Sequence, residues 1–229
     1  MELIDGTNLR ALLQAQGAFT VSQSLQYTQD ILEALRAAHR VGVIHRDIKP
    51  ENVLVPSEGP VRVTDFGLVR AASEVSMSTT GSMLGTVAYM APEIATSGVC
   101  DARTDIYAVG IMLYEFLTGE LPFQAETPIA TAYMHINEPM PHVAEQADWI
   151  PASLDSFIAL LTAKDASQRP ANGEEALREL LAITRSIPEE DLIRRIPVIP
   201  APQSDGEDDD GEDDAPPDPK PLPAAPTTT

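Results

Sequence analysis

His45-Arg46-Asp47-Ile48-Lys49-Pro50-Glu51-Asn52 is the stretch that decides the fold, and it stands between a long amphipathic run and the apolar triplet Val53-Leu54-Val55. A second short motif, Asp65-Phe66-Gly67, follows it closely in the chain. Together the two motifs offer carboxylates, an amine and an amide, which are the groups that phosphoryl transfer requires. The alternative is a plain turn between a helix and a strand, because Asp, Asn and Pro are common in turns.

Each polar residue of these motifs has a chemical role available to it. Asp47 can accept a proton from an attacking hydroxyl group, and Lys49 can neutralise charge on the transferred phosphoryl group. Asn52 and Asp65 carry the oxygen atoms that magnesium prefers as ligands. Any one of them alone is better explained as a turn residue, but the joint pattern H-R-D-x-K-x-x-N with D-F-G favours a phosphoryl-transfer site.

The two motifs resemble the catalytic loop and the magnesium-binding triplet of eukaryotic-type protein kinases. Lys49 makes the chain similar to the serine/threonine kinases, and the Met1-Glu2-x-x-x-Gly6 segment resembles the hinge of bacterial members. The resemblance implies ATP and Mg²⁺ as cofactors and protein serine or threonine side chains as acceptors. It assigns catalysis to Asp47 and Lys49 and metal binding to Asn52 and Asp65.

Other positions take a role from the resemblance alone. The backbone from Glu2 to Ile4 would contact adenine, and Leu54 would pack beneath it. His45 and Phe66 would stack in the internal spine of the domain.

A serine- and threonine-rich segment, Arg70 to Met83, follows the second motif. This composition is typical of any flexible loop, whereas the resemblance identifies the segment with an activation loop. Arg46 favours the second interpretation, because a phosphate on this loop could accept charge-assisted hydrogen bonds from its guanidinium group. The positions that match the phosphorylation sites of the family are Ser78 and Thr80, with Thr79 as a third candidate.

The segment from Gly85-Thr86 to Ala91-Pro92-Glu93 resembles the substrate-docking segment of the family. The resemblance implies that Thr86 bonds the two catalytic residues and that Glu93 forms a buried ion pair with Arg169. It also implies that Asp105 holds the backbone of the catalytic loop. For Asp105 a simple helix-start carboxylate, favoured by the helix dipole, is the alternative.

Hydrophobic periodicity predicts a mainly α-helical fold with a small β-hairpin, and composition predicts a disordered acidic, proline-rich tail after it. The resemblance implies that the helical part is the C-lobe of a protein kinase. The expected hairpin comprises Val53 to Val55 and Val61 to Thr64. The expected helices run from near Leu9 to near Gly17, from Val21 to Arg40, from Thr104 to Thr118, and over about 127–136, 153–163 and 173–185.

No G-x-G-x-x-G motif occurs in the sequence, and none of Lys49, Lys164 and Lys220 stands in a Val-Ala-Ile-Lys context. In the family these parts cover and hold the ATP phosphates. We therefore expect residues 1–187 to form the hinge and C-lobe of a kinase domain without its N-terminal lobe, and residues 188–229 to form the tail or a juxtamembrane linker. A start codon assigned too far downstream and a genuine truncation both explain this pattern.

The net charge of −20 argues against nucleic acid as a partner. No apolar run is long enough to span a membrane, and a single cysteine fits a reducing cytoplasm. The sequence thus predicts a cytoplasmic location, with membrane tethering in a longer parent protein as the alternative. The expected partners are protein substrates and ATP, with association between two kinase chains as a further option.

The predicted function is that of a serine/threonine protein kinase, present here as a domain fragment that is weak or inactive alone. The alternative is a non-catalytic docking or regulatory module derived from a kinase. The absent ATP-clamping motifs favour the alternative, whereas the intact set of Asp47, Lys49, Asn52 and Asp65 opposes it.

Overall fold

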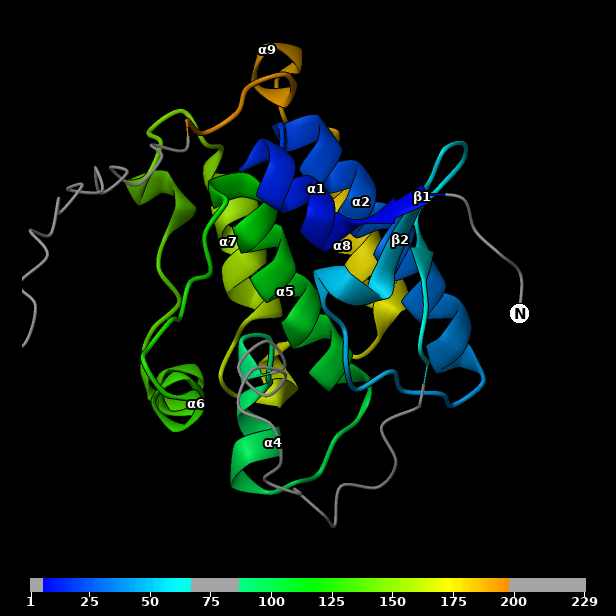
Figure 1. Ribbon diagram of the computed structural model, residues 1–229, viewed down its shortest axis with the longest axis vertical. Helices are drawn as coiled ribbons and strands as arrows, with labels where there is room; N and C mark the ends of the chain where they lie inside the picture. Colours follow the sequence, from blue (N-terminus) through cyan, green and yellow to red (C-terminus); the bar gives the residue numbers. More distant parts are fainter. Residues whose placement is uncertain (1–5, 67–86, 198–229) are drawn as a thin grey trace, which may run out of the picture. The chain divides into compact units, whose positions relative to one another are not determined.

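A computed structural model of the chain describes residues 6–66 and 87–197 (Figure 1). The expected fold class, mainly α with a small amount of β-structure, is confirmed. Several positions that carry sequence predictions lie outside the described residues, namely Glu2, Ile4, Gly67, Ser78, Thr79, Thr80, Thr86 and the chain after Pro197.

The described chain is built from helices with one small sheet near its start. The main elements in chain order are β1 (Gly6–Asn8), α1 (Leu9–Gln16), α2 (Val21–Arg40), β2 (Val53–Pro56), β3 (Arg62–Val63), α4 (Pro92–Thr96), α5 (Ala102–Thr118), α6 (Pro128–Asn137), α7 (Ala152–Leu161), α8 (Gly173–Thr184) and α9 (Glu189–Leu192). Three short 3₁₀ turns, η1 (Pro50–Asn52), η2 (Val143–Glu145) and η3 (Ala166–Gln168), connect some of them.

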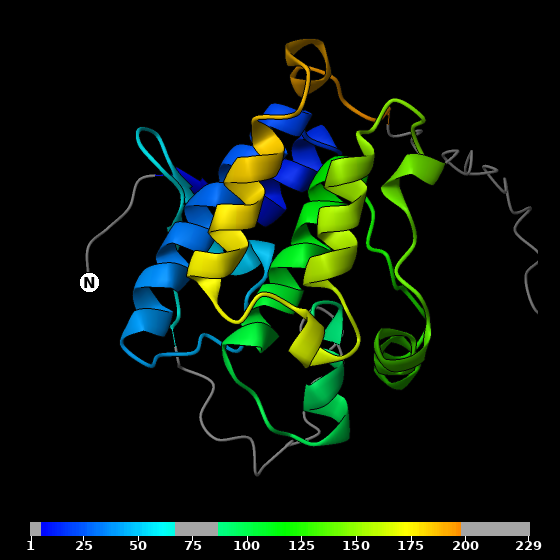
Figure 2. The ribbon, with the colours of Figure 1, turned by 180° about the vertical axis from the view of Figure 1, so that it is seen from behind.

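The core is formed around α5, which is buried along nearly its whole length. Helix α2 packs against α5 and α8, and α7 packs against α5. Figure 2 shows α8 in front of α2 and α7 in front of α5 on the face seen from behind. A β-carbon added to Gly110 of α5 would lie 2.8 Å from Leu161 Cβ of α7, so these two helices approach closely because Gly110 has no side chain.

The helix starts follow local capping chemistry. Thr20 and Gln23 form a capping box at the start of α2, in which each side chain bonds the backbone nitrogen of the other residue. Asp101 accepts a hydrogen bond from Arg103 N at the start of α5, and Gly119, with a φ of 78°, ends that helix. These signals define the start of α2 and both ends of α5, and α1, α2 and α5 to α8 all lie close to the predicted bounds.

The sheet has three antiparallel strands in the order β1-β2-β3, of which the sequence predicted only the second and third. Strand β1 pairs with β2 in the register Thr7 opposite Val55, and β2 pairs with β3 in the register Val53 opposite Val63. Gly6-Thr7-Asn8 is too short and too polar to show an apolar alternation. Its extended form depends on hydrogen bonds to β2 rather than on its own composition.

The packed part of the chain continues past the boundary expected between residues 187 and 188. Ile196 is only 4% exposed, and the backbone nitrogen of Val21 donates to Arg194 O over 3.0 Å. The guanidinium group of Arg194 lies 4.2 Å from the centre of the Trp149 ring. Contacts between Cα atoms divide the chain into Met1–Val198 and Ile199–Thr229. Composition did not predict this packing, because acidic residues and prolines surround the few apolar residues that take part in it.

None of the helices in residues 6–66 and 87–197 is long and apolar enough to cross a membrane.

Candidate active site

The loop that carries the first motif runs from the end of α2 to the start of β2. It leaves α2 through Gly42, whose φ of 76° lies in the left-handed region that glycine adopts readily. It ends in η1, which leads directly into β2. Because both flanking elements are packed against the core, Asp47, Lys49 and Asn52 are displayed from a loop that is anchored at both ends.

Asp105, near the start of α5, anchors the middle of this loop. Its carboxylate accepts hydrogen bonds from the backbone nitrogens of His45 and Arg46, each over 2.8 Å. Arg46 has a φ of 72°, a left-handed conformation that costs a residue with a side chain about 1 kcal/mol or more. The two bonds from Asp105 offset that cost, so the buried carboxylate holds the loop in a shape it would not adopt alone.

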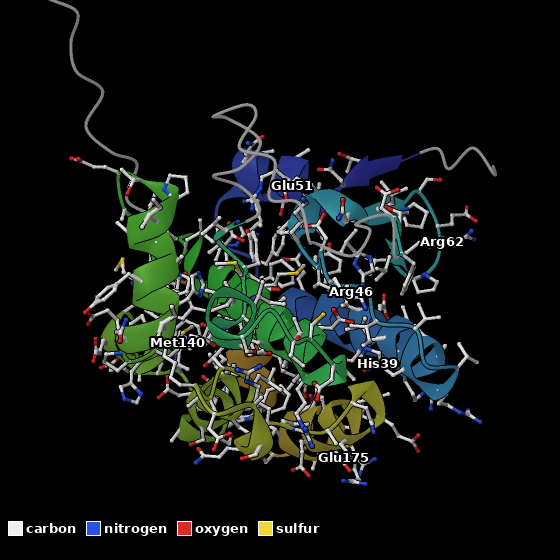
Figure 3. All side chains as sticks on the ribbon, turned by 90° about the horizontal axis from the view of Figure 1, so that it is seen from below. His39, Arg46, Glu51, Arg62, Met140 and Glu175 are labelled. Atoms are coloured by element: carbon white, nitrogen blue, oxygen red, sulfur yellow. The ribbon has the colours of Figure 1, made fainter. Side chains whose placement is uncertain are left out.

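His39 extends this anchor to α8. Its Nδ1 accepts from the backbone nitrogen of Gly173 over 3.1 Å, so the ring proton is on Nε2, which donates to Asp105 Oδ2 over 3.0 Å. His39 and Arg46, both labelled in Figure 3, come from the end of α2 and from the loop that follows it. The apolar periodicity that predicted α2 gave no sign of this link.

Asp47 is the centre of a compact polar group. Lys49 Nζ lies 3.0 Å from Asp47 Oδ1 and 2.8 Å from Oδ2. Asn52 Nδ2 donates to Asp47 O over 2.8 Å and to Asp47 Oδ2 over 3.0 Å. The structure therefore brings together three of the residues that the sequence predicted for the site, and Asp47 is held by both of the others.

The hairpin brings the second motif beside the first. Asn52 O accepts from the backbone nitrogen of Thr64 over 2.9 Å, which places Asp65 at the next position of the chain. His45 Nδ1 accepts from Asp47 N over 3.3 Å, so its Nε2 carries the proton and donates to Thr64 O over 2.7 Å. The His45 and Phe66 rings contact each other edge to face, with centroids 4.7 Å apart.

Asp65 is exposed and has a φ of 62°. A non-glycine residue in this conformation is uncommon and often occurs at functional sites. Leu54, expected beneath adenine, lies half-buried in the central strand β2, where it is opposite Asn8 of β1 and Arg62 of β3.

The donor set fits a magnesium ion bound together with phosphate. The Asn52 amide nitrogen donates to the backbone oxygen and to the carboxylate of Asp47, which turns Asn52 Oδ1 away from that residue. Asp65 adds an exposed carboxylate. Magnesium is usually held by one or two protein oxygens and completes its shell with substrate phosphates and water. The described residues contain no group of three or more His, Cys, Asp or Glu side chains that would form an all-protein metal cage.

A second polar cluster, not predicted from the sequence, lies beside the loop. Arg10 of α1 donates to Glu51 Oε1 over 2.8 Å, to Glu115 Oε1 of α5 over 2.6 Å, and to the hydroxyl of Tyr89. The Tyr89 hydroxyl donates to Glu115 Oε2 over 2.5 Å. This cluster joins α1, the catalytic loop, the segment before α4, and α5.

One sequence signal could have found this cluster. Glu115 is a charged residue within the otherwise apolar stretch of α5 from Ile106 to Leu117, and a buried charge needs a partner. The identity of that partner could not be predicted, because Arg10 is far from Glu115 in the sequence. Burial raises the pKa of Tyr89 well above its usual value, so this hydroxyl remains a donor.

Glu93 and Arg169 form a two-pronged ion pair, with Nη1–Oε1 and Nη2–Oε2 distances of 2.9 Å each. Thr104 Oγ1 also donates to Glu93, and Arg169 is 4% exposed. Burial alone would raise the pKa of Glu93, but the hydrogen bonds from Arg169, from the backbone and from Thr104, together with the positive charge of Arg169, outweigh burial, so the pKa is below its usual value. The contact expected between these two residues is thus present, and it connects the segment at the start of α4 to the turn before α8.

Comparisons with known proteins identify the family to which the chain is similar. Residues 1–181 match a family model described as protein kinase domain. The probable serine/threonine-protein kinase pknA2 of Bifidobacterium longum is 44% identical over 188 residues, which cover 82% of this chain and 25% of that protein. The serine/threonine-protein kinase PknL of Mycobacterium tuberculosis is 38% identical over 187 residues, covering 82% of this chain and 47% of that protein.

A third relative, the probable serine/threonine-protein kinase PknB of Lactococcus lactis, is 38% identical over 184 residues, covering 80% of this chain and 29% of that protein. The chain therefore spans at most about half of the length of these relatives.

Proposed function

This chain belongs to the protein kinase family, and we propose that its protein transfers the γ-phosphoryl group of ATP to serine or threonine side chains of other proteins. The observation that carries the proposal is the arrangement around Asp47, whose carboxylate is held by Lys49 and by the amide of Asn52. A carboxylate held in this way can orient a hydroxyl group and accept its proton as the new bond forms.

Each further residue has a distinct part. Lys49, which here pairs with Asp47, balances negative charge on the phosphoryl group during transfer. Asn52 and Asp65 would hold magnesium, which when bound would neutralise charge on the ATP phosphates. Leu54, with the backbone from Glu2 to Ile4, would contact the adenine. Most of the rate enhancement comes from positioning and charge stabilisation rather than from covalent chemistry.

The proposed kinase activity is regulated by phosphorylation of the segment after Asp65, which acts through Arg46. Arg46 has an exposed side chain, although its backbone is anchored by Asp105. A phosphate on Ser78, Thr79 or Thr80 would supply the acceptor oxygens for this guanidinium group. Thr86 would bond Asp47 and Lys49 from the docking segment.

We further propose that residues 1–229 alone have little activity. The support is the sequence itself, which contains no glycine-rich phosphate-covering motif and no lysine in the context that holds the α- and β-phosphates. A docking or regulatory module is the second candidate, and the same absent motifs favour it.

A phosphotransfer assay on the purified chain tests these proposals. With labelled ATP, magnesium and a generic protein acceptor, we expect slow transfer, well below the roughly 1 to 100 per second of complete kinases, that Asp47→Asn abolishes. The matched control Asp148→Asn removes an exposed carboxylate outside the site and should change nothing. Transfer that survives Asp47→Asn contradicts the assigned role, transfer at normal kinase rates contradicts the low activity, and no transfer at all favours the docking module.

A further inference from the structure

One side chain near the start of α1 contacts three other parts of the described fold. Arg10 Nε donates to Glu51 Oε1 over 2.8 Å, and its Nη1 donates to Glu115 Oε1 over 2.6 Å. The third nitrogen, Nη2, donates to the hydroxyl of Tyr89. The partners belong to η1, to α5 and to the segment before α4, so every nitrogen of one guanidinium group bonds a different part of the chain.

Two of these contacts are explained by the burial of Glu115. This residue is 3% exposed, and a buried carboxylate needs a cationic partner. Arg10 is that partner, and the Tyr89 hydroxyl donates to the second carboxylate oxygen over 2.5 Å. The bond from Arg10 to Glu51 is not needed for this purpose.

The bond to Glu51 determines where part of the catalytic loop lies. The side chains of Arg10 and Glu51 are 22% and 38% exposed, and ion pairs with this much exposure contribute little to stability. Among the described residues, Arg10 is the only hydrogen-bond partner of the Glu51 carboxylate, whose Oε2 is buried without one. Glu51, labelled in Figure 3, therefore depends on Arg10 for its position beside α1.

Glu51 and Tyr89 come from the two segments that the proposed phosphoryl transfer has to align. Glu51 directly precedes Asn52, whose amide nitrogen holds the carboxylate of Asp47. Tyr89 lies in the segment that resembles the substrate-docking segment of the family. A guanidinium group is planar and rigid, so it fixes the spacing of its partners. That spacing matters because a misplacement of about 1 Å can cost about a hundredfold in rate.

We propose that Arg10 is a positioning residue of the kinase reaction. It holds the catalytic loop at a fixed distance from the docking segment, so that the hydroxyl group of a bound acceptor protein reaches Asp47. Arg10 does not touch the reacting atoms and acts through Glu51 and Tyr89. The effect on transfer rests on the proposed function, whereas the hold on the two segments is measurable without it.

The substitution Arg10→Lys tests the proposal without removing the charge that Glu115 needs. A lysine can pair with one carboxylate, but it cannot hold three partners in the fixed geometry of a guanidinium group. Arg40→Lys, at an exposed position at the end of α2, is the matched control.

Hydrogen exchange at single amides, followed by NMR on residues 1–229, reports on the two segments separately. Asn52 N donates to Lys49 O within η1, and Met90 N donates to Val87 O in the turn that contains Tyr89. We expect both amides to exchange about tenfold faster in the Arg10→Lys variant and to be unchanged in the control. Unchanged exchange at both amides in Arg10→Lys overturns the proposal.

A double-mutant cycle shows whether Arg10 acts on the loop through Glu51. Glu51→Ala should speed exchange at Asn52 as much as Arg10→Lys does, and the double variant should add nothing further at that amide. Glu58→Ala, at an exposed position between β2 and β3, controls for the loss of a carboxylate. Effects that simply add at Asn52 overturn the proposed route through Glu51.

Transfer from labelled ATP to a protein acceptor separates positioning from a merely structural role. We expect Glu51→Ala to lower kcat about tenfold, and Tyr89→Phe to raise KM for the acceptor about tenfold while KM for ATP stays unchanged. A merely structural role would lower kcat alone in both variants, in proportion to the folded fraction, and that result overturns the proposal. No transfer by the wild type would count against the proposed function alone, because exchange at Asn52 and Met90 still decides whether Arg10 holds the two segments.

Discussion

The carboxylate of Asp105 accepts the backbone N–H of Arg46 over 2.8 Å, although the two residues are on different elements and far apart in the chain. Arg46 has a left-handed backbone, and the residue that follows it is the proposed catalytic Asp47. The position of Asp47 therefore depends on a buried side chain of α5 that takes no part in the chemistry.

Asp105→Asn should lower the free energy of unfolding by about 3 kcal/mol, because an amide offers one acceptor oxygen where the loop and His39 need two. Urea unfolding followed by circular dichroism measures the change. The exposed Asp148→Asn serves as the matched control, with an expected effect within about 0.5 kcal/mol. Equal stabilities of the two variants would show that the anchor is unimportant.

Arg10→Met should destabilise the chain by about 3 to 5 kcal/mol, because it leaves Glu115 buried without its cationic partner. The same substitution at Arg40, an exposed residue at the end of α2, controls for the loss of an arginine. Chemical unfolding of both variants measures the change in the free energy of unfolding. A decrease below about 1 kcal/mol for Arg10→Met would mean that Glu115 finds other partners.

Glu93→Gln should lower the free energy of unfolding at neutral pH, and the difference from the wild type should disappear in acid. The folded pKa of Glu93 lies below its ordinary value of 4.5, so the ion pair with Arg169 stabilises the fold above pH 4.5 and this contribution disappears as the pH falls through the folded pKa. Unfolding of the wild type and the variant over a pH series gives the difference. A difference that is constant down to about pH 3 would refute the assignment.

His135 should contribute acid sensitivity at higher pH than Glu93 does. Burial, with the charge of Lys164, lowers the pKa of His135 from 6.5 to about 4. The unfolded chain binds more protons between these values, so the stability of the fold decreases as the pH drops from 6.5 to 4. His135→Gln should flatten the stability profile in that window, whereas an unchanged slope would show that His135 is not the group responsible.

The proximity of the residues proposed for the site was predictable, because they lie close together in the sequence. Asp47, Lys49 and Asn52 belong to one loop, and the hairpin places Asp65 near them. The contacts that hold the catalytic loop in place could mostly not be predicted from sequence patterns. The pairs of Arg10 with Glu115 and of His39 with Gly173 depend on how distant helices pack.

The same contrast holds for the secondary structure: elements specified by their own sequence were predicted, and elements that depend on distant neighbours were not. Helices α2 and α5 were predicted closely from their apolar periodicity and end signals. Strand β1 and the packed segment up to Pro197 were not, since each is too short or too polar to form without its neighbours.

A magnesium-dependent ATP-binding titration on residues 1–229 tests the central claim most directly. We expect measurable binding in magnesium that Asp65→Asn weakens about tenfold or more, since a neutral amide oxygen then replaces the anionic carboxylate at one of the two protein ligands. Glu58→Gln, which removes an exposed carboxylate from the loop between β2 and β3, should leave the affinity unchanged. Binding that is absent in magnesium, or equal in the Asp65→Asn variant and the wild type, would contradict the claim that this loop and hairpin form a nucleotide and metal site.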